Sequence, residues 1–149
     1  MTTPAGNQST ARPAIADGGV PTGDALDALT ARLGPAPGAA RQARELVTEA
    51  CARWELADLV GPACTVLTEL VNNAVAHART EMLVRLTLVD GGLLVEVADR
   101  SPAPPQARGP ASPTTPGGRG LVVVQALAER WGCTADDGGK TVWALIRPE

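Results

Sequence analysis

The segment Thr65-Val66-Leu67-Thr68-Glu69-Leu70-Val71-Asn72-Asn73-Ala74-Val75-Ala76-His77-Ala78 lies in the middle of the chain, and its neighbours are interpreted from it. On a helix at about 100° per residue, its apolar residues gather on one face and its polar residues on the other. The apolar face holds Leu67, Leu70, Val71, Ala74 and Ala78. The polar face holds Thr65, Glu69, Asn72, Asn73 and His77. The pattern predicts an amphipathic helix over residues 61–78.

The polar face of this helix permits two interpretations. Glu69 and Asn73 are four residues apart and stack one turn above the other, with His77 one turn further on. A carboxylate beside an amide oxygen suits a bound metal ion and a water molecule that must lose a proton. A polar face is also the ordinary solvated side of a surface helix, and helix geometry alone favours this second interpretation.

Composition limits the classes of function. The chain has 149 residues, enough for one domain with a core. Its net charge is −3 and it has no Phe or Tyr, so a basic surface with stacking rings for nucleic acid is not expected. No apolar run approaches the roughly 20 residues of a bilayer span, and residues 1–23 do not resemble an export signal. We therefore expect a cytoplasmic protein that binds neither nucleic acid nor membranes.

The cysteines and the histidine narrow the chemistry further. Cys51, Cys64 and Cys133 are odd in number and form no paired metal-ligand spacing, which is typical of buried thiols in a reducing compartment. His77 is the only histidine, so a His-rich zinc site is excluded. A Ser/His/Asp triad would have to use His77, and nothing else in the sequence supports one.

The first half of the chain predicts a tail, a strand and two helices. Residues 1–23 hold almost no large apolar side chains and cannot offset the entropy of ordering, so we expect a disordered tail before a domain over 24–149. Residues 25–33 could form a short strand or a helical turn, and we favour an edge strand. Helical spacing of apolar residues predicts a helix over 38–54, ahead of the central helix.

Two alternating segments follow the central helix. Residues 81–89 and 93–98 alternate with period two and flank Asp90-Gly91-Gly92, which predicts a β-hairpin with Asp99 at its exit. Between Arg100 and Gly118 there are six prolines and no Leu, Ile or Val, which excludes a helix interior or a central strand. A loop of this length is usually a lid, a binding loop or a linker, although a passive loop explains it equally well.

The last third of the chain begins with the glycine-rich junction 117–120. We predict a buried helix over 121–131 that ends at Gly132, and a second hairpin with strands over 133–135 and 141–146. Helices and hairpins in this order predict an α+β fold. The expected architecture is a two-layer sandwich with a mixed, mostly antiparallel sheet, helices on one face and a Pro-rich lid over about residues 100–118.

Four motifs in this order resemble the GHKL ATPase superfamily, which includes gyrase, heat-shock chaperones, histidine kinases and mismatch-repair proteins. Over about residues 25–147 the chain is most similar to the small actinobacterial anti-sigma-factor kinase-like regulators. Glu69-Leu-Val-Asn-Asn73-Ala-Val-Ala-His77 resembles the N box, and Asp99 resembles the start of the first glycine box. Gly118-Arg119-Gly120-Leu121 resembles the second glycine box, and Gly139-Lys140-Thr141-Val142-Trp143 the closing segment. The resemblance implies a Bergerat-type fold in which residues 100–118 form an ATP lid.

The resemblance also implies roles for single residues. Asn73 would supply an oxygen to Mg²⁺ bridging the ATP phosphates, and Glu69 would be the general base. Asp99 would accept a hydrogen bond from the adenine amino group, supported by Thr141. The phosphates would be held by the second glycine box, made of Gly118, Arg119, Gly120 and Leu121. Three further residues would lie near the phosphates, namely Arg44, Asn72 and His77. For Arg44 a place facing the partner, and for His77 a helix-end hydrogen bond, remain alternatives.

One departure from the family's pattern is visible. The first glycine box normally runs Asp-x-Gly-x-Gly, whereas Ser101 and Ala103 stand at the glycine positions here. The resemblance implies a Mg-ATP-binding anti-sigma factor that acts as a serine/threonine kinase on an anti-anti-sigma protein, with a sigma factor as second partner and a homodimer as assembly. The alternatives are an ATP-dependent protein-binding module without kinase turnover and a detached histidine-kinase-type catalytic domain.

Overall fold

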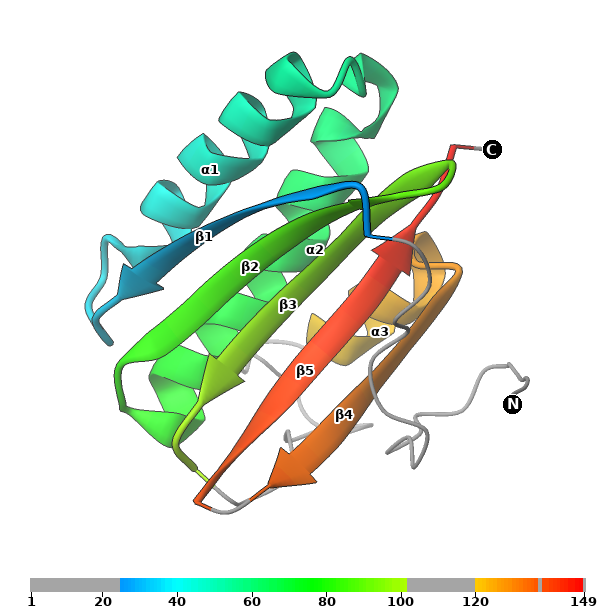
Figure 1. Ribbon diagram of the computed structural model, residues 1–149. Helices are drawn as coiled ribbons and strands as arrows, with labels where there is room; N and C mark the ends of the chain where they lie inside the picture. The colour runs from blue at the N-terminus through cyan, green and yellow to red at the C-terminus, as the bar shows by residue number, and fades with distance from the viewer. Residues whose placement is uncertain (1–24, 102–119, 137, 149) are drawn as a thin grey trace.

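The computed structural model describes residues 25–101, 120–136 and 138–148 (Figure 1). The expected tail over residues 1–23 lies outside these ranges. So does the expected lid, apart from its first two residues, Arg100 and Ser101. The elements that are described follow the expected order, with a strand and two helices before the first hairpin, and a third helix before the second hairpin.

In the part of the chain that the structure describes, the sheet has five strands in the order β1-β2-β3-β5-β4. All four neighbouring pairs are antiparallel. Three of the strands come from the first part of the domain, β1 (Asp27–Leu33), β2 (Met82–Val89) and β3 (Gly92–Asp99), and two from its end, β4 (Arg130–Asp136) and β5 (Gly139–Ile146). Figure 1 shows the helices together behind one face of this sheet. The predicted α+β fold with a largely antiparallel sheet and helices on one face is therefore confirmed.

Alternation along the strands explains why one face of the sheet becomes the core. Leu93, Val95 and Val97 of β3 are fully buried against the helices. The residues between them point to the opposite face, where Leu94 joins Trp143 and Leu145 in a second, smaller buried cluster. The sheet therefore carries apolar side chains on both faces.

Two long helices and one short helix cover the core face. Helix α1 (Ala39–Arg53) and helix α2 (Val60–Asn73) pack on each other and on the sheet, and the 3₁₀ turn η2 (Ala57–Leu59) lies between them. Helix α2 continues into a π-helical turn, η3 (Ala74–Ala78). The apolar face predicted for this segment is the buried one, with four residues in the core: Leu67, Leu70, Val71 and Ala74. Helix α3 (Gly120–Leu127) packs against α2.

The predicted helix over 121–131 is too long. Helix α3 ends at Leu127, and Trp131 lies in strand β4. Trp131 and Cys133 pack toward the core with period-two spacing, and backbone pairing with β5 stabilises this segment as a strand rather than a helix. Gly132, expected as a helix stop, lies inside β4 directly opposite Trp143.

The thiols and one apolar stretch bear on two further expectations. Cys51 and Cys133 are buried and Cys64 is half-buried, all three are free, and burial raises the pKa of each thiol. Within the described ranges, one helix, Ala57–Ala78, is by length and mean composition apolar enough to cross a bilayer, a test that the core helix of a soluble protein also passes. Its main part is α2, whose apolar face packs on the sheet.

Candidate functional site

The polar residues of α2 differ sharply in their exposure. Asn73 is only 6% exposed, and Glu69, one turn earlier, is half-buried. Asn72 and His77 are exposed, and His77 lies in the π-helical turn that follows α2. The predicted polar stripe is therefore not a uniformly solvated face, because its Glu69–Asn73 edge is turned partly into the protein.

The side-chain amide of Asn73 is buried at the C-terminal end of α2. Within the described ranges, the structure gives the Asn73 side chain no hydrogen bond, although a buried amide is normally paired. Its side-chain atoms are not among those that are both fully enclosed and unpartnered. Glu69 likewise has no hydrogen bond or ion pair among the residues that can be described. Asn73 thus offers an amide oxygen and Glu69 a carboxylate, one turn apart and ready for a ligand.

Arg44 contacts the same helix from α1. Its guanidinium Nη1 lies 3.3 Å from Thr68 Oγ1, the residue that precedes Glu69. Arg44 is exposed, and its backbone carbonyl accepts a hydrogen bond from Thr48. The structure therefore places a positive charge beside α2 close to Glu69, held by a neutral hydroxyl rather than by a carboxylate.

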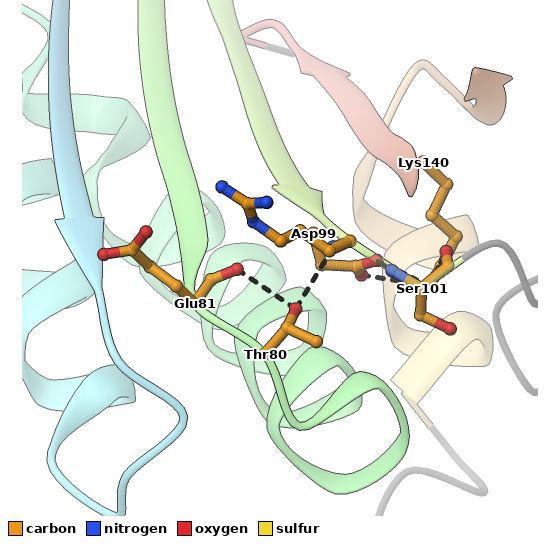
Figure 2. A network of polar contacts seen from close by, with 6 residues as sticks. Thr80, Glu81, Asp99, Ser101 and Lys140 are labelled. Atoms are coloured by element: carbon orange, nitrogen blue, oxygen red, sulfur yellow. Dashed lines mark hydrogen bonds and ion pairs between the residues drawn. The ribbon is translucent and has the colours of Figure 1, made fainter. Parts of the chain in front are cut away.

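Asp99 ends strand β3 and lies in a network of polar contacts (Figure 2). Both carboxylate oxygens contact the Lys140 ammonium, with Nζ to Oδ1 at 3.1 Å and Nζ to Oδ2 at 2.9 Å. The backbone N–H of Ser101 donates to Oδ1 at 2.8 Å. The side chains of Asp99 and Lys140 are only 2% and 6% exposed, so this is a buried ion pair.

A second set of contacts ties the exit of β3 to the start of β2. Thr80 donates from Oγ1 to the Glu81 carbonyl at 3.1 Å and accepts the backbone N–H of Arg100 at 3.1 Å. Figure 2 shows Thr80 and Glu81 on one side of Asp99, with Ser101 and Lys140 on the other. The backbone just after Asp99 is thus fixed by a hydroxyl from the segment that follows the central helix.

The register of β5 places Thr141 away from Asp99. Lys140 is the residue paired with Asp99 in the sheet, and Thr141 is paired with Ala98. Since successive side chains of a strand point to opposite faces, Thr141 lies on the face of Trp143, opposite to the core side that holds Asp99. The expected support of Asp99 by Thr141 does not fit this register, and Lys140 occupies the position instead.

Sequence reasoning missed Lys140 and Thr80. The position of Lys140 could have been predicted from strand alternation. Residues 140, 142 and 144 lie on the same face of an alternating strand, and Val142 and Ala144 are core residues. Nothing in the sequence distinguishes Thr80 from any other loop threonine.

The second glycine box is only partly described. Gly118 and Arg119 lie outside the described residues. Gly120 begins helix α3, and Leu121 is buried in its first turn. Because α3 packs against α2, the described end of this box belongs to a helix that contacts the one carrying Glu69 and Asn73.

An open pocket of about 280 Å³ has Asp99 among its lining residues, at the end of the sheet where β3 ends and β5 begins. Its walls also include Arg32, Leu83 and Ala98, which the register places in one row across β1, β2 and β3. This row alternates with the core residues, so that part of the wall faces away from α2. Asn73 is not among the lining residues.

Among the residues that the structure describes, no group of three or more His, Cys, Asp or Glu could hold a metal ion. A magnesium ion near α2 would therefore draw on the Asn73 oxygen and on oxygens brought by its ligand. That donor set fits Mg²⁺, which commonly takes one or two protein ligands beside phosphates and waters.

Comparison with known families agrees with this arrangement. The model of the histidine kinase-like ATPase domain matches residues 33–146, from the end of β1 to the end of β5. The chain belongs to this family. Membership identifies the domain as one of an ATP-binding type, usually with Mg²⁺, and the match includes Glu69, Asn73, Asp99 and Lys140.

A solved structure shares the fold of this family member. It contains the RsbU and RsbW domains of Rv1364c from Mycobacterium tuberculosis, and it aligns with a TM-score of 0.62 at 23% sequence identity. The alignment covers 82% of this chain and 32% of that chain, so this chain spans about a third of that protein's length. No curated protein matches the sequence.

Proposed function

We propose that this protein is a Mg-ATP-binding regulator that phosphorylates a serine or threonine of an anti-anti-sigma protein and sequesters a sigma factor. The proposal also includes a homodimer in the cytoplasm, as the resemblance to anti-sigma-factor kinases implies. The observation that carries it is the side-chain amide of Asn73, which lies one turn from Glu69 and to which the described residues give no hydrogen bond. Its atoms are not fully enclosed, so the amide oxygen is open to a ligand.

Each residue has a specific part in this proposal. Asn73 holds the magnesium ion through its side-chain oxygen. The ion would supply positive charge against the phosphates of the nucleotide. Glu69 accepts the proton of the attacking hydroxyl, a role that suits a half-buried carboxylate to which the described residues give no ion pair. Asp99 recognises the base, and the second glycine box binds the phosphates through backbone N–H groups.

A binding module without turnover is the alternative within the same site. Asp99 already uses its carboxylate on Lys140 and Ser101, so a base that binds there competes with contacts inside the protein. Under this alternative ATP binding sets a surface for the partner, and no phosphate leaves the nucleotide.

The test measures ATP binding and phosphate transfer with the full chain. Calorimetry with Mg²⁺ and ATP should show binding by the wild type, and Asn73→Ala should weaken it by about tenfold or more, equivalent to about 1.4 kcal/mol. Gln42→Ala, which removes an exposed amide from α1, is the matched control and should bind as the wild type does. Absence of binding by the folded wild type, or equal binding by Asn73→Ala, would refute the nucleotide proposal.

A phosphate-transfer assay distinguishes the kinase from the binding module. With γ-labelled ATP and an anti-anti-sigma protein of the same genome, the wild type should label a partner serine or threonine. Glu69→Gln should retain ATP binding, and its rate of phosphate transfer should fall by about 10²-fold or more, the usual contribution of a general base. Glu49→Gln, an exposed glutamate of α1, serves as the control. Binding without any label on the partner would favour the binding module.

A further inference from the structure

The face of the sheet opposite the helices carries a cluster of apolar side chains that are almost fully enclosed. This outer cluster consists of Leu94, Trp143 and Leu145, which are 3%, 4% and 3% exposed, and Val89 packs against it. On an open sheet face such side chains would contact water, and a side chain as large as tryptophan is seldom buried to this extent. A layer of atoms therefore lies over this part of the sheet.

The described elements do not supply that layer. Figure 1 shows the helices behind the opposite face of the sheet, where they pack against the core. Neighbouring strands cannot cover the indole from the side, because the register places Trp143 between Glu96 and Gly132, and a glycine has no side chain. The cover of the outer cluster thus comes from outside the described residues.

The enclosed area forms a band that stops short of the edge strand β1. Thr87 of β2, paired with Leu94, is only 6% exposed, whereas Ala28 of β1, paired with Thr87, is exposed. The indole Nε1 of Trp143 is fully enclosed and has no hydrogen-bond partner among the described residues. A layer that excludes water from this N–H and offers it no acceptor makes an apolar contact there.

The N-terminal segment enters the sheet beside this band. The backbone N–H of Leu26 donates to the Leu88 carbonyl at 2.8 Å, which places the start of the described chain next to β2. From β1, strands β3 and β5 are two and three strand spacings away, or about 10 and 14 Å. Val20 precedes Ala25 by five residues, and an extended chain of that length spans about 17 Å. The segment is therefore long enough to reach the outer cluster.

The other long segment outside the described ranges is less suitably placed. Residues 102–119 follow Ser101 at the far end of β3, and they lead into α3, which packs against α2 on the helical side of the sheet. Both of its ends thus lie away from the outer cluster. Position favours the N-terminal segment as the cover.

We propose that residues 1–24 lie across the outer face of the sheet and cover the outer cluster. The segment has two large apolar side chains besides Met1, those of Ile15 and Val20, and these supply the apolar contact. So few apolar residues predict disorder for the segment by itself, and the sheet provides the apolar surface that it lacks. Displacement of the segment bares an apolar face that a second copy of the chain can occupy. The inference does not depend on nucleotide binding.

The experiment measures how fast hydroxyl radicals label each tryptophan in the full chain, with mass spectrometry to resolve the peptides. In the wild type, Trp143 should be labelled more slowly than the half-buried Trp131. Ile15→Asp combined with Val20→Asp puts charges at the proposed contacts, and labelling of Trp143 should rise severalfold while that of Trp131 stays the same. Gln8→Asp combined with Ser9→Asp adds the same charge at polar positions and should label as the wild type does.

A second measurement identifies what lies over the outer cluster. A photo-crosslinking benzoylphenylalanine at position 20 should link to a peptide that contains Leu94 or residues 141–147 of the same chain. Links between two chains, or Trp143 that stays protected when positions 15 and 20 are charged, would mean that a second copy or another segment is the cover. Equally fast labelling of Trp143 and Trp131 in the wild type would also overturn the proposal. If the charged variant labels at all three tryptophans, it has unfolded, and the cross-link decides.

Discussion

Glu96 is a charged residue that the sheet holds in an unfavourable environment. It lies on the face opposite the helices, with Arg85 paired across on β2 and Trp143 on β5. Burial raises the pKa of the Glu96 carboxyl, and the positive charge of Arg85 opposes this shift without cancelling it. The folded protein therefore holds a proton on Glu96 at pH values where the unfolded chain has released it.

The sign of the resulting pH dependence follows from proton linkage. With its pKa above the ordinary 4.5 in the folded state, Glu96 favours folding at low pH, and this contribution is lost as the pH rises through the folded pKa. We expect the stability of the wild type relative to Glu96→Gln to fall over that window. Urea unfolding from pH 4 upward measures it, with the exposed Glu45→Gln as control. A difference that stays level or grows with pH would contradict the prediction.

Single residues of the site were predictable only in part. The spacing of Glu69 and Asn73 gave their common place on the helix, because four residues make about one turn. The spacing of residues does not predict the burial of Asn73, because that depends on how α2 packs on the sheet. The closing-segment motif favours Thr141 over its neighbour Lys140, and only the pairing of β5 with β3 shows which of the two faces Asp99.

At the scale of an element, α1 ends in a conformation that L-amino acids avoid. Glu55 follows the C-terminal cap Trp54 and has φ of 57°. The next N–H, of Leu56, donates to the Cys51 carbonyl at 2.8 Å, as in a Schellman motif. Glycine is the usual residue at this position because it has no Cβ to clash.

Glu55→Gly should therefore stabilise the protein. The left-handed conformation costs an L-residue about 1–2 kcal/mol, and the greater freedom of glycine in the unfolded chain costs about 0.5–1 kcal/mol, which leaves a gain of up to about 1.5 kcal/mol. The midpoint of urea unfolding should rise. The same substitution within the helix, Glu49→Gly, should lower stability by about 1 kcal/mol. A fall with both variants would show that Glu55 makes contacts worth more than its strain.

The boundaries of elements show where sequence patterns compete. Helix α3 ends at Leu127 and strand β4 begins at Arg130. The segment that spans this boundary, Ala-Leu-Ala-Glu-Arg over residues 126–130, has a composition typical of helices. Pairing of β4 with β5 decides where the helix ends, and that pairing is a long-range property of the sheet. The β2–β3 hairpin was predictable because its turn residues and its alternation are both local.

At the scale of the whole molecule, one core joins the helices to the sheet. Leu67 of α2 is fully buried in it and is among its largest enclosed side chains. Helix α2 contacts α1, α3 and the central strands β3 and β5. A cavity at Leu67 would therefore weaken contacts with several elements together.

Leu67→Ala should lower the free energy of unfolding by about 2–5 kcal/mol, a large share of the roughly 5–15 kcal/mol that keeps a domain folded. The thermal midpoint should fall by at least about 4 °C, since each kcal/mol is worth about 2–4 °C at this size. Leu26→Ala removes the same atoms from a residue that is 62% exposed, and should change the midpoint little. A small effect at Leu67 would mean that α2 is not packed as described.

The order of layers could be predicted because hairpins and amphipathic helices have their own sequence signals. The pairing of β3 with β5 brings the two hairpins into one sheet. No local sequence pattern predicts this pairing, because it arises when both hairpins bury their apolar faces against α2. The same pairing assembles the candidate site, so the site was less predictable than the fold.

The β4–β5 hairpin restricts how this protein can evolve. Lys140 and Thr141 are neighbours on β5 that face opposite sides of the sheet. A one-residue insertion or deletion in the turn before them would bring Thr141 to the face that contacts Asp99 and turn Lys140 to the other face. The same shift would also turn Trp143 into the core and Val142 and Ala144 out of it. A change in the length of that turn therefore cannot replace the residue that contacts Asp99 without disrupting the core. Point substitution at position 140 is the route that preserves the fold.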